Sequence, residues 1–209
     1  GFSSPNLVSL AGREQILIFN SFSVVSHDPS DGRVLWRQPW DPVECVANPL
    51  TLPGDRVLVS SGYGIGSRLY QVKDLHDGDL SSDIVWESRR LKAKFANMVY
   101  HDGFVYGLDD GVLVCLDPED GRRRWKRGRY GHGQLILVDD ILLVMSESGE
   151  VVLVAANPHG HEELARMQVF DEKTWNPPAF AAPYLLVRTE KEAACYVMPL
   201  AGGALVQRF

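Results

Sequence analysis

The chain lacks any apolar run long enough to cross a bilayer. Its longest runs, residues 141–145 and 151–156, fall far short of the roughly 20 residues that a membrane helix needs. It also lacks a basic excess, since 21 Lys and Arg residues stand against 27 Asp and Glu, for a formal net charge of −6. An acidic chain is poorly suited to the phosphate backbone, so we expect no nucleic-acid partner. No signal peptide is visible, and the first residue is Gly1, which is typical of a processed or excised piece.

Cysteine is scarce and scattered. The three cysteines, Cys45, Cys115 and Cys195, form neither a Cys-x-x-Cys pair nor an even set. This pattern excludes a complete disulfide framework and a cysteine zinc site. We interpret all three as small buried hydrophobic residues. Hydrophobic residues make up 45% of the 209 residues, which excludes a disordered chain and suffices for the core of one sizeable domain.

Helical patterns are nearly absent, and only residues 161–166 have a helical appearance. Short segments rich in Val, Ile, Leu and aromatic residues dominate instead, each bounded by Gly, Pro, Asp or Asn. We expect strands near residues 15–19, 56–60, 104–106, 111–116, 141–145, 150–154 and 184–188. Strands without alternating helices exclude a parallel α/β sheet and predict an all-β fold.

An internal repeat defines the architecture. Residues 28–36 (DPSDGRVLW) recur as residues 117–125 (DPEDGRRRW), with a stretched copy from Asp74 to Trp86 and a decayed copy that ends at Leu164. Trp36 and Trp86 are 50 residues apart, Trp86 and Trp125 are 39 apart, and Trp125 and Leu164 are 39 apart. A four-stranded propeller blade has this length, roughly 40–50 residues. We therefore expect these rings to pack between neighbouring blades.

A second sequence feature recurs at a similar spacing along the chain. A small or polar residue leads into an apolar strand five times, which predicts four complete blades and a fifth that stops early. The expected blades of this single domain, residues 1–209, span residues 4–44, 45–93, 94–129, 130–174 and 175–209. About four and a half blades leave exposed sheet edges, which proteins rarely tolerate. We expect the remaining blades of an eight-bladed ring, or another chain, to complete the structure.

The repeat resembles the tryptophan-containing motif of the pyrroloquinoline quinone-like (PQQ-like) β-propellers, and residues 116–125 match it well with Cys115 in place of the usual Ala. The segment from residue 91 to 153 is similar to a bacterial branch of PQQ-like repeat proteins. The resemblance implies an extracytoplasmic, periplasmic propeller of about eight blades. The best-understood non-enzymatic relative in that family is the propeller lipoprotein of the outer-membrane assembly machinery. A binding or scaffolding role follows, with protein, peptide or glycan as the ligand.

The same family also contains quinoprotein dehydrogenases, which use the quinone with a Ca²⁺ ion. Those enzymes usually have an adjacent cysteine pair, which this chain lacks. Their calcium ligands are carboxylate and amide oxygens; Asp109, Asp110, Glu147 and Asn97 offer such oxygens here, but their spacing defines no cage. We therefore expect no enzyme activity, cofactor or metal, with a calcium-dependent quinoprotein oxidoreductase as the alternative. His159 and His161 have no nearby third ligand and predict no metal site.

Candidate binding residues lie where a propeller concentrates loops around its channel. These are the segments leading into each first strand and the loops between second and third strands. His132 is notable because Gly131 and Gly133 allow close backbone approach. The alternative for the asparagines is simple hydrogen bonding to loop backbone. We predict a ligand-binding rim that contains Asn97, Asp109, Tyr130, His132 and Trp175.

Overall fold

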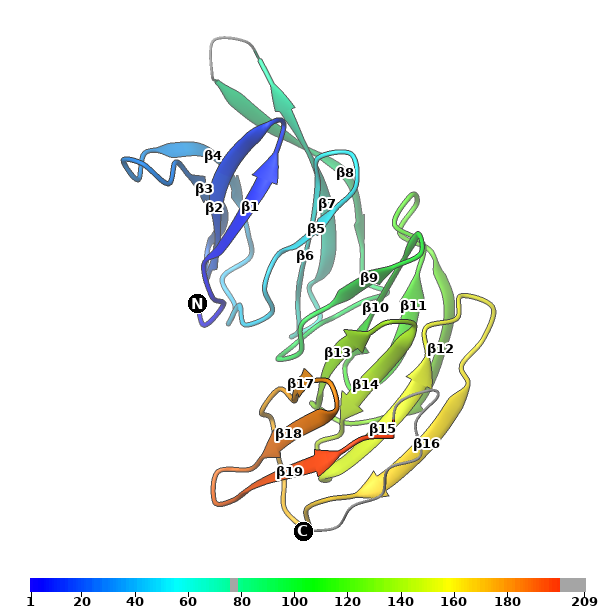
Figure 1. The fold of residues 1–209 in the computed structure, drawn as a ribbon. Helices are drawn as coiled ribbons and strands as arrows, with labels where there is room; N and C mark the ends of the chain where they lie inside the picture. Colours follow the sequence, from blue (N-terminus) through cyan, green and yellow to red (C-terminus); the bar gives the residue numbers. More distant parts are fainter. Residues whose placement is uncertain (76–78, 200–209) are drawn as a thin grey trace.

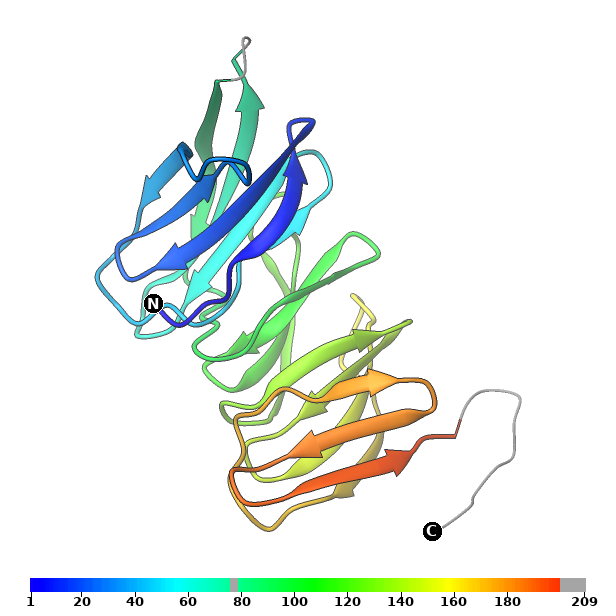
Figure 2. The same cartoon turned by 60° about the vertical axis from the view of Figure 1, so that its left-hand side comes forward.

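The structure, a computed structural model, describes residues 1–75 and 79–199. Within these residues every regular element is a β-strand, and the strands form five antiparallel sheets. The sheets follow one another in chain order, with β1–β4 at one end of the molecule and β17–β19 at the other (Figure 1). The turned view of Figure 2 shows the same succession of sheets. Each sheet has its strands in sequence order, as expected for propeller blades.

Five sheets contain all the strands of the described residues. We number the blades by sheet. Blade 1 contains β1 (Asn6–Leu10), β2 (Arg13–Asn20), β3 (Ser23–His27) and β4 (Val34–Pro39). Blade 2 contains β5 (Leu50–Leu52), β6 (Arg56–Ser61), β7 (Gly66–Asp74) and β8 (Leu80–Ser88). Blade 3 contains β9 (Val99–His101), β10 (Phe104–Asp109), β11 (Val112–Leu116) and β12 (Arg123–Arg129). Blade 4 contains β13 (Gln134–Val138), β14 (Ile141–Met145), β15 (Glu150–Ala155) and β16 (Glu163–Gln168), and blade 5 contains β17 (Ala179–Ala181), β18 (Tyr184–Arg188) and β19 (Ala193–Val197).

The all-β fold with four-stranded antiparallel blades is confirmed. Residues 161–166, which had a helical appearance in the sequence, contribute to the edge strand β16. The stretched turn at residues 74–78 and the expected end of the fifth blade, residues 200–209, fall partly or wholly outside the described residues. The described part of blade 5 has three strands.

The core consists of separate layers between neighbouring blades. Strand side chains alternate between the two faces of a sheet, so an inner blade must be apolar on both faces. In β14, Leu142 and Val144 pack towards blade 3, whereas Leu143 and Met145 pack towards blade 5. Continuous apolar strands in this sequence therefore indicate burial on both faces by neighbouring blades.

Tryptophan side chains extend these layers at three junctions. The Trp86 indole Nε1–H donates to the carbonyl of Pro118 in the next blade at 2.8 Å, and Trp125 donates to the carbonyl of Asn157 at 2.8 Å. Gly121 makes room for the Trp86 ring, because a Cβ there would lie 2.9 Å from it. Gly121 also has a φ of +67°, which favours glycine. The tryptophans of blades 2 and 3 thus join each of these blades to the turn of the following one.

Trp36 differs in its hydrogen bond. Its ring is buried in the layer between blades 1 and 2, but its Nε1–H donates at 2.8 Å to the Gln15 side chain of its own blade. Strands β7 and β8 of blade 2 have nine residues each, longer than the corresponding strands of blade 3.

The fourth copy of the repeat requires a correction. In the pairing of third and fourth strands, blades 1 to 4 have a β-bulge at corresponding positions, where one residue is skipped: Leu35, Val85, Arg124 and Leu164. In the first three blades the tryptophan comes directly after that residue. Ala165, and not Leu164 as the sequence spacing predicted, therefore occupies the tryptophan position of blade 4. Among the described residues, an apolar hollow of about 290 Å³ lies beside Ala165.

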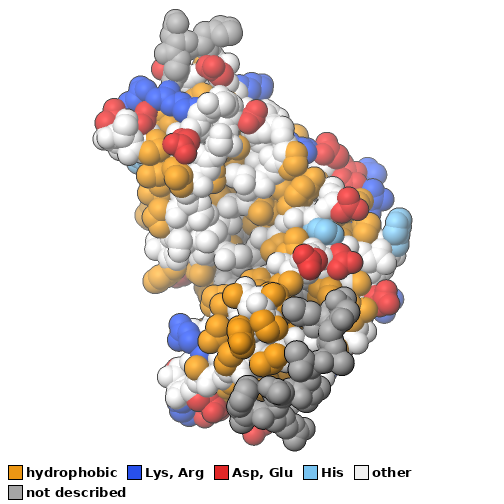
Figure 3. All heavy atoms as spheres, in the orientation of Figure 1, with side chains coloured by type: hydrophobic (Ala, Val, Ile, Leu, Met, Phe, Trp, Pro, Cys, Tyr) orange, Lys and Arg blue, Asp and Glu red, His pale blue; other side chains and the backbone are white. Residues whose placement is uncertain are grey.

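The outward face of blade 5 is apolar and exposed. Tyr184 and Leu186 of β18 are 51% and 48% exposed, and Val197 of β19 lies on the same face. Figure 3 shows hydrophobic side chains gathered over this sheet. Cys195 also lies there and is exposed, contrary to the expected burial of all three cysteines, whereas Cys45 and Cys115 are buried. The sheet face therefore resembles the inner faces of blades 2 to 4, without a covering sheet among the described residues.

Removing an indole at a blade junction should destabilise the fold. We expect Trp125→Ala to lower the free energy of unfolding by about 3 kcal/mol, because both ring contacts and the bond to Asn157 are lost. Trp125→Phe retains most of the ring and should cost about 1 kcal/mol for the hydrogen bond. Urea unfolding followed by circular dichroism measures both. The exposed Leu164→Ala is the control, expected within about 0.5 kcal/mol, and equal losses in Trp125→Ala and Leu164→Ala would contradict the junction role.

Candidate functional site

One end of the propeller gathers loops from several blades. First and third strands run away from this end and second strands return to it, so first-strand starts and second-to-third loops share it. We call it the rim and define it by the lead-in segments 45–49, 91–98, 130–133 and 171–178 and the loops 62–65 and 146–149. The rim is the surface that residues far apart in the sequence can build together.

An aromatic cluster lies at the rim. The Phe95 ring centroid is 5.2 Å from that of His132, in an edge-on arrangement, and 5.0 Å from that of Trp175. These residues come from the lead-in segments of blades 3, 4 and 5. Trp175 remains 43% exposed, so its ring is partly open to solvent. The structure thus brings together two of the five predicted residues, His132 and Trp175, through a third ring.

Glu147 fixes the positions of two cluster members. One carboxylate oxygen accepts the His132 backbone N–H at 2.9 Å, and the other accepts the Trp175 indole N–H at 2.8 Å. Gly131 is required for this approach, because a Cβ there would lie 2.4 Å from the carboxylate. Burial raises the pKa of Glu147, but the two hydrogen bonds and the nearby Lys173 outweigh it, so its pKa lies below its ordinary value.

Two lysines lie against the rings. The Lys173 Nζ is 3.7 Å from the Trp175 ring centroid, and the Lys94 Nζ is 4.6 Å from Tyr63 and 5.2 Å from Phe95. Such cation–π contacts leave the N–H donors of the ammonium groups available. Over residues 1–75 and 79–199, neither lysine forms an ion pair with a carboxylate. The rim therefore alternates cationic groups with aromatic surface.

Asn97 has a bracing contact at the rim. Its side-chain oxygen accepts the backbone N–H of Asn48 at 2.8 Å, and the Asn48 side chain accepts the N–H of Ser4 at 2.8 Å. At the next step, the Gln134 amide donates to the carbonyl of Phe95 at 2.8 Å. Blades 2, 3 and 4 thus each reach back to the lead-in backbone of the preceding blade. This is the loop hydrogen bonding that the sequence left open as the alternative for the asparagines.

The structure places Asp109 and Tyr130 away from the aromatic cluster. Asp109 is only 1% exposed, and its carboxylate pairs with Lys92 and Lys126. Tyr130 is 2% exposed, and its hydroxyl is hydrogen-bonded to His161 Nε2 at 2.8 Å. Burial raises the pKa of the Tyr130 hydroxyl to about 12. Both side chains are engaged by groups of their own blade and its lead-in segment, and they are not open to a ligand as positioned.

Sequence reasoning missed Phe95, Lys94 and Lys173. The sequence did contain a usable signal, because Lys94 and Phe95 directly precede the lead-in residues Ala96 and Asn97, and Lys173 lies two residues before Trp175. A cation close in sequence to an aromatic residue thus recurs before two first strands. The meeting of the rings depends on the angle between blades, which no local pattern specifies.

Open hollows flank Trp175 and Lys173. One, of about 630 Å³, includes Thr174, Asn176, Glu190 and Lys191 in its lining. The other, of about 500 Å³, includes Arg129, Glu147 and Asp171. The loop that carries Trp175 thus stands between two depressions.

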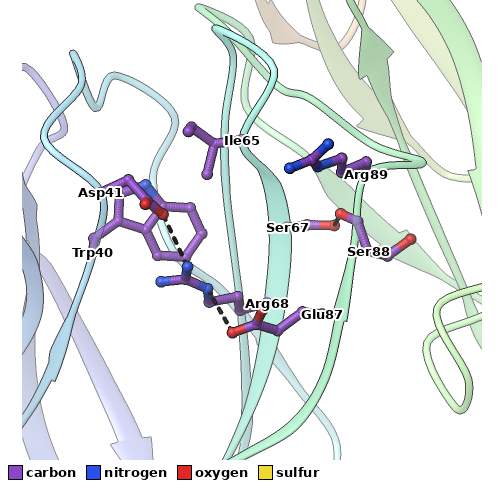
Figure 4. Close-up of a pocket in the computed structure, with 8 residues that line it drawn as sticks. All are labelled: Trp40, Asp41, Ile65, Ser67, Arg68, Glu87, Ser88 and Arg89. Carbon is purple, nitrogen blue, oxygen red and sulfur yellow. Dashed lines mark hydrogen bonds and ion pairs between the residues drawn. The ribbon is translucent and has the colours of Figure 1, made fainter.

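A further hollow of about 340 Å³ lies between blades 1 and 2 (Figure 4). Arg68 lies there over the Trp40 ring, 4.4 Å from the centroid, and pairs with Asp41 and Glu87 at 2.9 Å each. Because the guanidinium is engaged by two carboxylates and a ring, it fastens the two blades. This arrangement favours a structural role.

The side-chain oxygens considered as calcium ligands do not form a site for calcium and a quinone. Asp109 is engaged by two lysines, Asp110 by Lys92, and Glu147 by two N–H donors, while Asn97 accepts from Asn48. Among the described residues, no three His, Cys, Asp or Glu side chains are placed to hold one metal ion. Over the same residues, no helix is long and apolar enough to span a membrane.

Comparison with known proteins identifies the family. The family model described as outer membrane protein assembly factor BamB, of the PQQ-like group, matches residues 1–127, more than half of the chain. The chain belongs to this BamB family. The crystal structure of BamB from Moraxella catarrhalis is similar with a TM-score of 0.62 and 16% sequence identity. This likeness covers 93% of the present chain and, at that identity, shows the fold.

The present chain spans 62% of the length of the Moraxella catarrhalis BamB chain. A search among curated proteins found no match. Membership of the BamB family and the shared propeller fold are therefore the findings on which a functional proposal can rest.

The contact between Glu147 and Trp175 should depend on pH. Because its pKa is lowered, Glu147 stays ionised to a lower pH than an ordinary glutamate, and the contribution of its hydrogen bonds is lost as the pH falls through the lowered pKa. We expect the Trp175 indole N–H resonance in ¹⁵N-correlated NMR spectra to shift on acidification. Glu147→Gln should abolish that titration while the resonances of Trp86 and Trp125 stay unchanged. An identical titration in the variant would contradict the assignment.

Proposed function

We propose that this BamB-family propeller is a non-catalytic scaffold that binds a segment of a partner protein at its rim, outside the cytoplasm. The observation that carries the proposal is the cluster of Phe95, His132 and Trp175, which three blades build together at the loop end. Exposed aromatic residues on positioned loops are typical recognition groups. The family description, an outer membrane assembly factor, supports both a protein ligand and an extracytoplasmic location.

A binding role suits the chemistry of the rim better than catalysis. Glu147, the carboxylate in the aromatic cluster, accepts hydrogen bonds on both oxygens and has a lowered pKa, which does not suit a general base or acid at neutral pH. No observation favours the quinoprotein alternative, and the engaged state of its candidate ligands argues against it.

We further propose that another blade of the same repeat covers the outward face of blade 5. By strand register, Leu186 and Cys195 occupy the positions that Leu143 and Leu153 hold in blade 4, where blade 5 covers them. An apolar sheet face and an open edge are an aggregation hazard unless covered. The covering blade belongs either to a longer form of this protein or to a second chain that completes the ring.

The rim proposal is tested by changing His132 and Trp175 to Ala together. In the source cells, a photo-crosslinking residue at Tyr63 should capture a protein partner, and the double variant should reduce that capture. The melting temperature should change little, because Trp175 is half exposed. A crosslinker at Leu164, on the outer strand, is the control. A large fall in melting temperature would show that the two residues are structural, and capture of a glycan in place of protein would contradict the ligand class.

The quinoprotein alternative has a direct assay. We expect added quinone and Ca²⁺ to produce no reducible chromophore and no alcohol- or sugar-dependent dye reduction. Dye reduction that depends on both additions would overturn the non-catalytic role.

Covering of the blade 5 face is tested by association in solution. The 209-residue chain alone should self-associate, and Leu186→Lys should weaken that association by placing charge on the apolar face. Leu164→Lys, at a similarly exposed position on β16, is the matched control. Light scattering across a concentration series measures the effect. A chain that is monomeric at every concentration, or equal effects of both lysines, would contradict the proposal.

A further inference from the structure

The rim has a charge pattern that differs from the rest of the molecule. The chain carries a net charge of −6, and lysines elsewhere pair with carboxylates, such as Lys73 with Asp83 and Lys191 with Glu172. Lys94 and Lys173 form no ion pair among the described residues and lie on aromatic rings instead. An ammonium over a ring keeps donors free for an anion from outside.

These groups form a strip with a fixed order. Lys94 contacts Phe95, Phe95 contacts Trp175, and Trp175 contacts Lys173. Tyr63, which is 45% exposed, continues the strip beyond Lys94. Two cations therefore flank an aromatic surface. A complementary ligand has an apolar or aromatic group in the middle and one anionic group on each side of it.

The surrounding carboxylates confine such a ligand to the strip. Both oxygens of Glu147 already accept hydrogen bonds, and Glu172 is paired with Lys191 at 2.6 Å. Asp171 and Glu190 line the hollows on the two sides of the Trp175 loop and disfavour an anion there. The favourable position for acidic groups is thus at the two lysines.

We propose that the strip of Lys94, Phe95, Trp175 and Lys173 binds an extended protein segment in which acidic residues flank an aromatic residue. This inference rests on the proposed function of the rim and specifies its ligand. The aromatic side chain of the segment lies against Phe95 and Trp175, and its carboxylates take the free donors of the two lysines. Charge at the edge of an apolar contact gives specificity against neutral and basic segments.

The test uses the 209-residue chain and three synthetic peptides with the cores Glu-Phe-Glu, Gln-Phe-Gln and Lys-Phe-Lys. Binding is followed by NMR on the Trp175 indole resonance. The Glu-Phe-Glu peptide should bind tightest, and added salt should weaken it. Lys94→Gln combined with Lys173→Gln should weaken it about twofold to thirtyfold, since exposed ion pairs contribute about 0.2–1 kcal/mol each and the rings remain.

Lys73→Gln, far from the strip on blade 2, is the matched control and should leave binding unchanged. An unchanged melting temperature of the double lysine variant shows that folding is intact. Equal binding of the acidic and neutral peptides, or equal affinity of the double variant and the parent chain, overturns the ligand assignment. If crosslinking still captures a protein at the rim in that case, the proposed function stands and only this inference fails.

Discussion

Every part of this structure depends on sheets that are apolar on both faces. A blade in the middle of the chain buries alternate side chains of one strand against two different neighbours, as β14 does with blades 3 and 5. Each blade is thus positioned only through the blades beside it. The angle between adjacent sheets also decides where their lead-in segments meet. The aromatic cluster at the rim is consequently a product of blade packing, because its three rings belong to three separate blades.

The junctions are built on one plan with local variation. A layer of aliphatic side chains lies between the blades, an indole closes the outer side of three junctions, and polar side chains join the lead-in segments at the rim. The junction between blades 4 and 5 differs from the others both on its outer side and at the rim. Ala165 replaces the indole, and the contacts of Trp175 with Glu147 and Phe95 replace the amide bonds. The two changes occur at the same junction.

The architecture could be predicted from the sequence because the repeat consists of residues that act locally, within one turn and the strand after it. Asp, Gly and Trp at fixed spacing define a turn and the strand that follows, so the all-β fold and the Trp86 and Trp125 junctions could be predicted. The Ala165 position could not, since a one-residue bulge shifts the register without altering composition. Tyr130 lies in a lead-in segment and Asp109 at the end of β10, but the directions of their side chains depend on partners elsewhere in the chain, namely Lys92, Lys126 and His161. Phe95 gained its importance only from rings contributed by other blades.

The substitution at Ala165 has a thermodynamic consequence for the rim. Without an indole on the outer side, the last sheet is held mainly by its aliphatic layer, and the contacts of Trp175 add a smaller contribution at the rim. A ligand that engages Trp175 then also fastens blade 5 to its neighbour, so attachment of the sheet and occupancy of the rim are linked equilibria. A blade that covers the outward face of blade 5, and thereby stabilises the attached sheet, would by the reciprocity of linkage also tighten binding at the rim.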